Sequence, residues 1–303
     1  MTTVYAYAPD APIGPALALG VDDANVYFGS SGLFAIRPSS PNPSPILPTY
    51  GIESVRGIVA GSVALFATVS LDSGTQGLFR LRLDGTAPGN VFPIAAAVLG
   101  PLAVDGDRAF VATSTGVYAV NGDGSHVVTI PVNEEIRGLA VAAGSLFAST
   151  SSVSATPSYS VWMGNGDGDT LAKIATSDHE IDAIAVTSTH VVWAEQYSYQ
   201  QPDVPTSIRR ARHDGTNGET PLTLSQGLLA FSIAADEHAL YYSDGATIVE
   251  VELATKTSTV LADNQASAAG LVVRGGAVYW LNQPSWKLSE TPTKNGVRAA
   301  CVK

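Results

Sequence analysis

The residue types that could do chemistry gather just ahead of three related apolar segments of the chain. Arg56, Arg137 and Asp182 occupy one corresponding position before these segments. His179 is followed by Glu180, so its imidazole could act as a general base that a carboxylate of Glu180 or Asp182 orients. His179, Glu180 and Asp182 are therefore the candidate catalytic residues. For His179 itself, a solvated residue at the entry to its segment is favoured over this role.

A ligand-binding cleft is expected around the same charges. Aromatic walls with a few charged groups suit a sugar, a peptide or a small polar molecule. The alternative is a solvated rim on which the charges pair with one another, as Arg137 could pair with Glu135. The predicted ligand-binding residues are Arg56, Arg137, Glu135, Glu180, Asp182, Phe231, Tyr197, Tyr199 and Trp286.

Metal and cofactor motifs are weak in this sequence. No histidine pair has zinc spacing, and Cys301 is the single cysteine, which excludes a cysteine-rich zinc site. The turns Asn121–Gly124 and Asn165–Asp169 resemble fragments of calcium loops, but both lack the glutamate at position 12, so hairpin turns are favoured. Glutamates at an axial mouth could hold calcium, but Arg56 and Arg137 would repel it. No metal or cofactor is expected, and axial calcium is the alternative.

Other chemically suggestive residues favour structural roles. His190 and His238 lie in the same turn before a second strand, and His126 and His213 are expected to be exposed in turns before a fourth strand. The basic run Arg209–Arg212 alternates along a strand, and a surface strand is favoured there over an anion site. The sequence contains no Gly-X-Ser-X-Gly elbow, phosphate loop or dinucleotide fingerprint.

Composition limits the function classes. The 303 residues carry a formal charge of −11 and are 45% hydrophobic, so a folded acidic protein is expected and a nucleic-acid binder is not. No run of 18 apolar residues occurs, so membrane insertion is not expected. Met1–Asp10 lacks the basic and apolar regions of a signal peptide. Composition favours an extracytoplasmic or secreted mature form, and a cytoplasmic location follows if this N-terminus is native.

The elements that must position these residues recur along the chain. Two apolar stretches, separated by a turn rich in Asp, Gly, Ser or Thr, occur seven times at intervals of about 42 residues. A third β-prone stretch, a Gly- or Asp-rich turn and a fourth stretch follow. The expected repeats are 14–49, 53–95, 97–133, 134–178, 179–227, 228–265 and 266–302.

This periodicity predicts an all-β fold, a single β-propeller domain over residues 1–303 with seven blades of four antiparallel strands. The aromatic residues of each second strand should fill the space between blades. A pair of β-sandwiches is the alternative, but it does not explain seven similar repeats. Either residues 3–8 or residues 297–302, the latter as a fourth strand, should close the last blade.

Two segments resemble a known repeat. Ile184–Glu195 reads IAVTSTHVVWAE, and Ile233–Asp244 reads IAADEHALYYSD. Both are similar to the repeats of bacterial low-density-lipoprotein-receptor-like (YWTD-like) β-propellers of the myxobacterial type, and the resemblance extends at repeat level over nearly the whole chain. It implies a β-propeller fold and an extracytoplasmic setting, but no activity. The chain departs from many members because it lacks paired cysteines.

Loop lengths suggest which propeller face carries function. Long loops between second and third strands are expected at Ser70–Gln76, Ser149–Ser160 and Glu195–Ser207, on the face that also receives the charged residues, and Asn282–Lys287 lies on this face too. Long insertions on one face of a repeat array commonly mark a binding surface.

The predicted function is a non-catalytic binding module that recognises a carbohydrate, peptide or protein through this face. The alternative is a propeller hydrolase or lyase with its active site at the mouth of the central channel, and a structural scaffold is the third possibility. The expected partner is a small polar ligand, a glycan or a protein, and the protein is expected to be a monomer.

Overall fold

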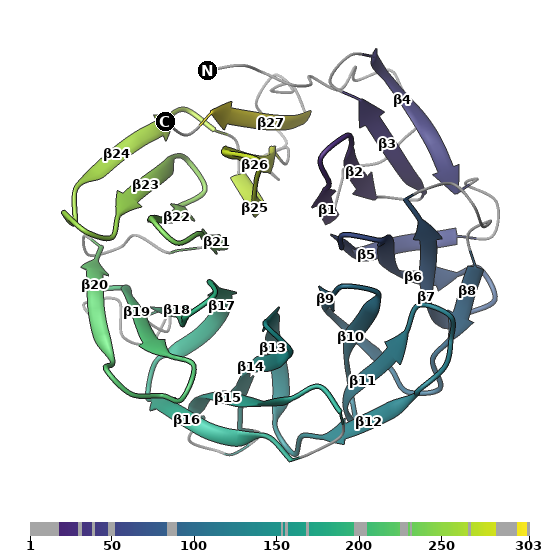
Figure 1. The fold of residues 1–303 in the computed structure, drawn as a ribbon, viewed down its shortest axis with the longest axis horizontal. Helices are drawn as coiled ribbons and strands as arrows, with labels where there is room; N and C mark the ends of the chain where they lie inside the picture. The colour runs from purple at the N-terminus through teal and green to yellow at the C-terminus, as the bar shows by residue number, and fades with distance from the viewer. Residues whose placement is uncertain are drawn as a thin grey trace. The chain divides into compact units, whose positions relative to one another are not determined.

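The computed structural model of the chain describes residues 18–29, 32–37, 40–47, 52–83, 90–152, 154, 157–167, 170–196, 205–224, 230, 232–265, 268–282 and 296–301. Every regular element in these ranges is a β-strand (Figure 1), which confirms the predicted all-β class. The same ranges contain no helix that is long and apolar enough to cross a membrane.

Strands that follow one another in the chain pair antiparallel, so each sheet is a meander of consecutive strands (Figure 1). The chain divides into two compact units. Unit 1 comprises Met1–Ala95, Gly245–Ile248 and Val260–Lys303, and unit 2 comprises Ala96–Asp244 and Val249–Thr259. The prediction of a single domain stays a prediction.

Unit 1 contains three sheets. The first has β1 (Ala18–Val21), β2 (Val26–Gly29), β3 (Leu33–Arg37) and β4 (Ser40–Leu47), and the second has β5 (Ile52–Ala60), β6 (Ala64–Leu71), β7 (Gln76–Arg82) and β8 (Asn90–Pro93). The third sheet has β25 (Ala268–Arg274), β26 (Ala277–Asn282) and β27 (Gly296–Cys301).

Four further sheets each have four strands, and the boundary between the units passes through β23 and β24. They are β9 (Val98–Asp105), β10 (Arg108–Thr113), β11 (Gly116–Asn121) and β12 (Val128–Pro131); β13 (Glu135–Ala142), β14 (Ser145–Ser151), β15 (Tyr159–Asn165) and β16 (Ala172–Ser177); β17 (Glu180–Val186), β18 (His190–Gln196), β19 (Ser207–Arg212) and β20 (Glu219–Thr223); and β21 (Ser232–Ala235), β22 (Ala239–Ser243), β23 (Ile248–Glu252) and β24 (Ser258–Ala262).

The predicted set of seven four-stranded blades is not supported. Six sheets have four strands within the described residues, and the last has three. The segment predicted as a closing fourth strand, residues 297–302, instead supplies β27, which pairs with β26 as the third strand. The other candidate for closure, residues 3–8, lies outside the described residues.

Burial follows the position of a strand within its sheet. The first strand β13 alternates between solvent and core, with Glu135 and Arg137 exposed and Ile136 and Gly138 buried. The second strand β14 is buried along nearly its whole length, because both of its faces are covered. In this sheet, therefore, a second strand that is buried on both faces follows a first strand that alternates.

Hydrophobic cores form between consecutive sheets within each unit. In unit 2, Phe147 and Val161 of one sheet pack in the same core as Ile181, Val191 and Trp193 of the next. In unit 1, the first two sheets share a core as well. The predicted role of the second-strand aromatic residues as inter-sheet filling is confirmed, with Phe66, Phe147, Trp193, Tyr241 and Trp280 all almost fully buried.

Two of the loops predicted to be long are shorter than the sequence pattern indicates. In the second sheet, β6 and β7 remain paired from Ser70 to Gln76, so the connection is a tight turn in which Leu71 N donates to Thr75 O (2.8 Å). In the β13–β16 sheet, β14 and β15 remain paired up to Ser151 and Tyr159. Strand pairing extends into polar sequence because backbone hydrogen bonds do not depend on side-chain polarity.

We expect Gly116→Ala to lower the free energy of unfolding by about 3 kcal/mol. Gly116 has φ +134°, and a Cβ there would lie 2.2 Å from the backbone oxygen of Ile130 on the partner strand. Gly106→Ala, in the β9–β10 turn of the same sheet, is the matched control: φ is +60° and the space is open, so the cost should be about 1–2 kcal/mol. Urea unfolding of both variants measures the difference, and equal losses would contradict the close approach at Gly116.

Candidate functional site

The predicted charges occupy β-bulges in the first strands of three sheets. The register between β13 and β14 shifts at Arg137, and the register between β17 and β18 shifts at Asp182. In unit 1 the register between β5 and β6 shifts at Arg56. A bulge leaves one extra residue unpaired and re-aims its side chain. The three residues that correspond in the repeats therefore share one structural position, and all three are exposed.

Within unit 2, the bulges on β13 and β17 place charged residues close together. The Arg137 Nη2 atom lies 3.6 Å from Oε2 of Glu135 and 4.0 Å from Oε1 of Glu180. The Arg137 Nε atom donates to Oγ of Ser151 (3.4 Å). We refer to Glu135, Arg137, Glu180 and Asp182 as the bulge cluster. Its ion pairs are partly exposed, so they contribute little to stability.

Negative charge exceeds positive charge in the bulge cluster. Partial loss of hydration raises the pKa of Glu180, and the charge of Asp182 raises it further while Arg137 opposes the shift. The pKa of Asp182 is also raised, because the surrounding protein removes part of its hydration although the side chain keeps exposed surface. The charge of Arg137 opposes this rise, and the charge of Glu135 adds to it. Tyr159, on β15, has its pKa raised by burial and then by Glu180, so its hydroxyl borders the cluster.

His179 does not complete a catalytic pair in this arrangement. Its backbone N–H donates to Oγ of Ser177 (3.0 Å). Among the described residues, the imidazole ring makes no hydrogen bond to Glu180 or Asp182. The predicted catalytic role of these three residues therefore stays a prediction without a base–orienter contact to support it.

The remaining predicted ligand-binding residues are not part of the bulge cluster as described. Tyr197, Tyr199, Phe231 and Trp286 lie outside the described residues. Arg56 lies in unit 1 and is exposed at its own bulge. Their contribution to a binding site stays a prediction.

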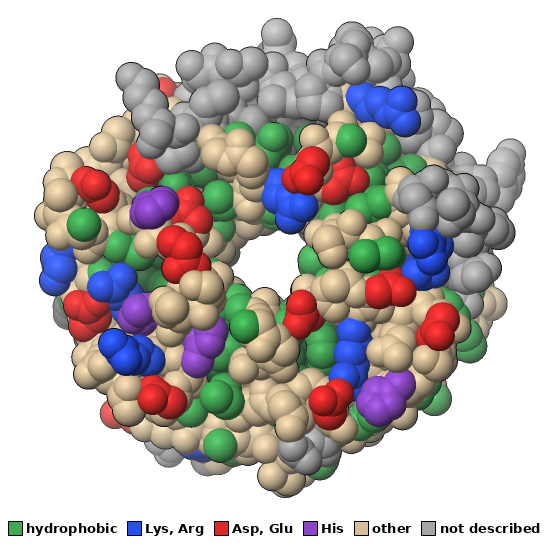
Figure 2. Space-filling view, viewed as in Figure 1, with side chains coloured by type: hydrophobic (Ala, Val, Ile, Leu, Met, Phe, Trp, Pro, Cys, Tyr) green, Lys and Arg blue, Asp and Glu red, His purple; other side chains and the backbone are tan. Residues whose placement is uncertain are grey.

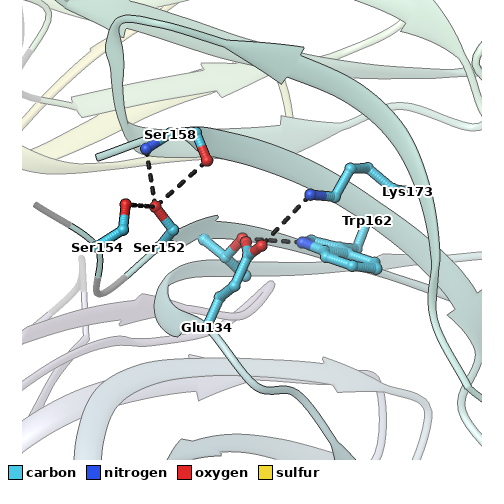
Figure 3. Close-up of polar contacts among 7 residues, drawn as sticks. Glu134, Ser152, Ser154, Ser158, Trp162 and Lys173 are labelled. Atoms are coloured by element: carbon cyan, nitrogen blue, oxygen red, sulfur yellow. Dashed lines mark hydrogen bonds and ion pairs between the residues drawn. The ribbon is translucent and has the colours of Figure 1, made fainter. Parts of the chain in front are cut away.

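A second polar cluster lies beside the start of β13 (Figure 3). Thr150 Oγ1 donates to Oε2 of Glu134 and accepts from Nε1 of Trp162 (2.8 Å). Lys173 Nζ lies 3.3 Å from Oε1 of Glu134 and 4.6 Å from the centroid of the Trp162 ring. These contacts tie the chain entering β13 to all three following strands of its sheet.

The β14–β15 connection is closed by serine hydroxyls. Oγ of Ser152 accepts hydrogen bonds from the Ser158 backbone N–H (2.9 Å) and hydroxyl (3.3 Å), and it lies 3.1 Å from Oγ of Ser154 (Figure 3). The Ser152 N–H in turn donates to Ser158 O (2.8 Å). The loop that the sequence places at Ser149–Ser160 is therefore pinned at its base.

The neighbouring sheet has a related cluster around a buried carboxylate. Glu195 Oε1 accepts from Nε1 of Trp193 (3.0 Å) and from Nη1 of Arg209 (3.1 Å), and the guanidinium lies 5.8 Å from the indole centroid. The Glu195 side chain is 8% exposed. The sequence analysis predicted that Glu195 begins a loop, whereas it lies on β18. Residues two positions apart on a strand share a face, so the spacing of Trp193 and Glu195 could have indicated that their side chains meet.

The turn at Asn165 that resembles a calcium loop holds an arginine. Asp167 forms an ion pair with Nη1 of Arg108, and the Asp167 N–H donates to Oδ1 of Asn165 (3.0 Å). Among the described residues, no group of three or more His, Cys, Asp or Glu side chains is placed to hold a metal ion. The prediction that no cofactor or calcium is bound is not tested by these contacts.

One of the histidine expectations is wrong. His126 is exposed as predicted, with 51% of its side chain accessible. His213 is instead half-buried: its ring lies 4.8 Å from that of Phe147, and Nε2 lies 3.2 Å from the backbone oxygen of Thr187. The turn before β20 folds back between two sheets, so His213 packs instead of facing water.

No protein-family model and no curated protein matches the chain. It is similar to the WD40 domain of Pan2 from Neurospora crassa (TM-score 0.68, 12% identity, covering 100% of this chain and 95% of that one). It is also similar to puromycin hydrolase (0.65, 12%, 99% and 56%) and to a chain of a nidogen/laminin complex (0.54, 15%, 73% and 85%). At these identities the likeness shows the β-propeller fold alone. It does not single out the YWTD-like proteins of the myxobacterial type.

We expect Thr150→Val to lower the free energy of unfolding by about 1–3 kcal/mol, because it removes the hydroxyl that joins Glu134 to Trp162 and leaves both polar groups short of a partner. Ser154→Ala, on the exposed side of the same connection, should change it by less than about 0.5 kcal/mol. Urea unfolding followed by tryptophan fluorescence compares the two. A neutral Thr150→Val variant would show that the chain of contacts in Figure 3 contributes no net stability.

The double variant Glu180→Gln, Asp182→Asn should raise the melting temperature at pH 7. Both carboxyls have raised pKa values, so the folded state binds protons more tightly than the unfolded state does. The free energy of unfolding therefore falls as the pH rises from the unfolded-state pKa of these carboxyls through their folded-state pKa. Neutral side chains remove that loss, and the advantage should disappear at acidic pH, where the wild-type carboxyls are protonated too. Glu219→Gln, which removes the partner of Arg210, should lower the melting temperature instead. Calorimetry at several pH values compares the two variants with the wild type, and no gain at pH 7 for the double variant would contradict the raised pKa values of Glu180 and Asp182.

Proposed function

We propose that this β-propeller is a non-catalytic binding module that recognises a peptide or protein through the bulge cluster and the surface around it. One observation carries the proposal: on the neighbouring strands β13 and β17, Glu135 and Glu180 both lie within 4.0 Å of the Arg137 guanidinium, and Asp182 adds a third carboxylate that this cation attracts. The complementary partner surface presents lysine or arginine side chains.

Electrostatics explains why such a partner would bind. An incoming ammonium or guanidinium group would supply the positive charge that the cluster lacks and would favour the ionised forms of Glu180 and Asp182. Charge complementarity of this kind increases association rates and gives specificity, and salt weakens it. The partial exposure of Glu135, Arg137 and Glu180 leaves these groups accessible to a macromolecule.

The predicted glycan or small polar ligand depended on an aromatic wall. The residues of that wall lie outside the described part of the chain, while the charged half of the site is described. A basic peptide or protein segment is favoured by the charge pattern itself, because the carboxylates of the bulge cluster outnumber its one guanidinium. Protein association also fits the structural neighbours, which include a chain from a nidogen/laminin complex.

A hydrolase or lyase is the second candidate. The raised pKa of Glu180 is the property that a general acid needs near neutral pH, and one structural neighbour is a puromycin hydrolase. Against this, His179 lacks an orienting contact with Glu180 or Asp182 among the described residues. The binding role therefore has the better support.

Titration with a tetralysine peptide at low ionic strength tests the proposal by calorimetry. The triple variant Glu135→Gln, Glu180→Gln, Asp182→Asn should weaken binding by about tenfold or more, because close charge pairs couple by more than about 1.4 kcal/mol. Arg137→Met should strengthen binding, because it removes the competing cation. The triple variant Asp72→Asn, Glu252→Gln, Asp263→Asn removes three exposed carboxylates outside the cluster, so it is the charge-matched control and should have little effect.

Three outcomes would overturn the proposal. Weaker binding by Arg137→Met would show that the arginine itself contacts the partner, and an equal loss of binding in the two triple variants would show that only net charge matters. If Glu180→Gln abolished hydrolysis of an ester or glycoside substrate while leaving peptide binding intact, the enzyme alternative would replace the binding role.

A further inference from the structure

The opposite end of the β17–β20 sheet carries a separate group of cations. His190 at the start of β18 pairs directly with Arg212 at the end of β19, so their side chains lie on the same face of the sheet. Arg210 lies two residues earlier on β19 and shares that face. Figure 2 shows histidine side chains beside lysine or arginine side chains over this part of the surface.

The His190 imidazole is held with one nitrogen available. Its Nδ1 atom lies 2.8 Å from Oγ1 of Thr189, and its backbone N–H donates to Oγ1 of Thr187 (3.1 Å). Within the described part of the chain, Nε2 makes no hydrogen bond. The ring is half-buried at the rim of the sheet, so its orientation is defined while Nε2 can still meet a ligand.

The nearby carboxylates are already engaged. Glu219 forms an ion pair with Arg210, and Asp214 accepts from the N–H (2.9 Å) and hydroxyl (2.6 Å) of Thr216. On the neighbouring sheet, Glu237 accepts from the backbone N–H of Ser188 (2.6 Å). Because these carboxylates are engaged, the positive charge of the patch formed by His190, Arg210 and Arg212 is not fully neutralised.

The other cationic groups define the local field. Arg212 is exposed and makes no ion pair within 4 Å with any described residue. His213 turns its ring toward Phe147, and His238 is exposed in the β21–β22 turn of the next sheet. Burial lowers the pKa of His190, and Arg210, Arg212 and His213 lower it further while Glu219 opposes the shift. Three cationic groups therefore act on this imidazole against one carboxylate, Glu219.

We infer that His190 and Arg212 form an anion-binding site for a phosphate group, either free or carried on another molecule. Arg212 supplies a planar fork of donors, and His190 supplies Nε2–H when it is protonated. Arg210 keeps its ion pair with Glu219 and contributes positive charge near the site without contacting the anion. This site is separate from the bulge cluster, because the bulges lie where β13 and β17 begin, whereas this patch lies beyond the end of β17.

Binding should be coupled to protonation of His190. A phosphate group between the two side chains favours the imidazolium, so it should raise the pKa of His190 by about one unit and bind about tenfold more tightly to the protonated form. Affinity should accordingly fall between pH 6 and pH 8, although phosphate itself gains charge over that interval.

NMR titration of the histidine Cε1–Hε1 resonances tests this inference on the full chain, with inorganic phosphate added at constant ionic strength set by sodium chloride. The His190 resonance should shift with saturation and show the raised pKa, while His238 serves as an internal control. Arg212→Gln should remove the effect. Lys256→Gln, an exposed cation on another turn, should retain it. A His190 titration curve that phosphate does not move, or that moves equally in Arg212→Gln and Lys256→Gln, overturns the inference.

A second arm identifies the source of the phosphate group. A short phosphoserine peptide that binds at least about tenfold more tightly than inorganic phosphate would assign the site to a phosphorylated partner, while equal affinities would assign it to the free ion. An unphosphorylated peptide that shifts His190 equally would contradict phosphate recognition.

Discussion

The structure depends on one constraint: a four-stranded sheet of this sequence cannot bury its second strand without another sheet on each side. The β14 strand is buried on both faces, and the cores on its two sides are built by different neighbours. Phe147 and Trp193 belong to a core that exists only when consecutive sheets face each other. Hydrophobic burial thereby stacks the sheets, and the strand ends are left as the places where polar chemistry can occur.

The strand ends carry charge because bulges interrupt the regular alternation there. A strand that paired without interruption would turn every second side chain toward the core, which would bury a charge at a substantial free-energy cost. The extra residue at Arg137 or Asp182 is turned outward instead. Loss of hydration, and after it the charge of neighbouring carboxylates, raises the pKa of Glu180 and Asp182, so their ionised forms oppose stability slightly; such local conflicts are typical of functional surfaces.

The two ends of the β17–β20 sheet differ in chemistry. Carboxylates exceed cations at the bulge end, while His190, Arg210 and Arg212 gather at the hairpin end. Trp193, Glu195 and Arg209 also lie toward the bulge end and interact with one another, so their charges act on local structure more than on a partner. Opposite charges at opposite ends of one rigid sheet give each end its own preference in ligands.

The sequence by itself determined the repeating β-strands, the buried second-strand aromatics and the shared position of Arg56, Arg137 and Asp182, because these follow from local periodicity. Only the tertiary structure decided which polar groups meet. Thr150 joins Glu134 and Trp162 across three strands, and His213 packs on Phe147 from the next sheet. The sequence also did not predict how far β6 and β14 extend, or that β27 is the third strand of its sheet. Backbone pairing and contacts between distant residues depend on distances in space, and those are set by packing of whole sheets instead of by spacing along the chain.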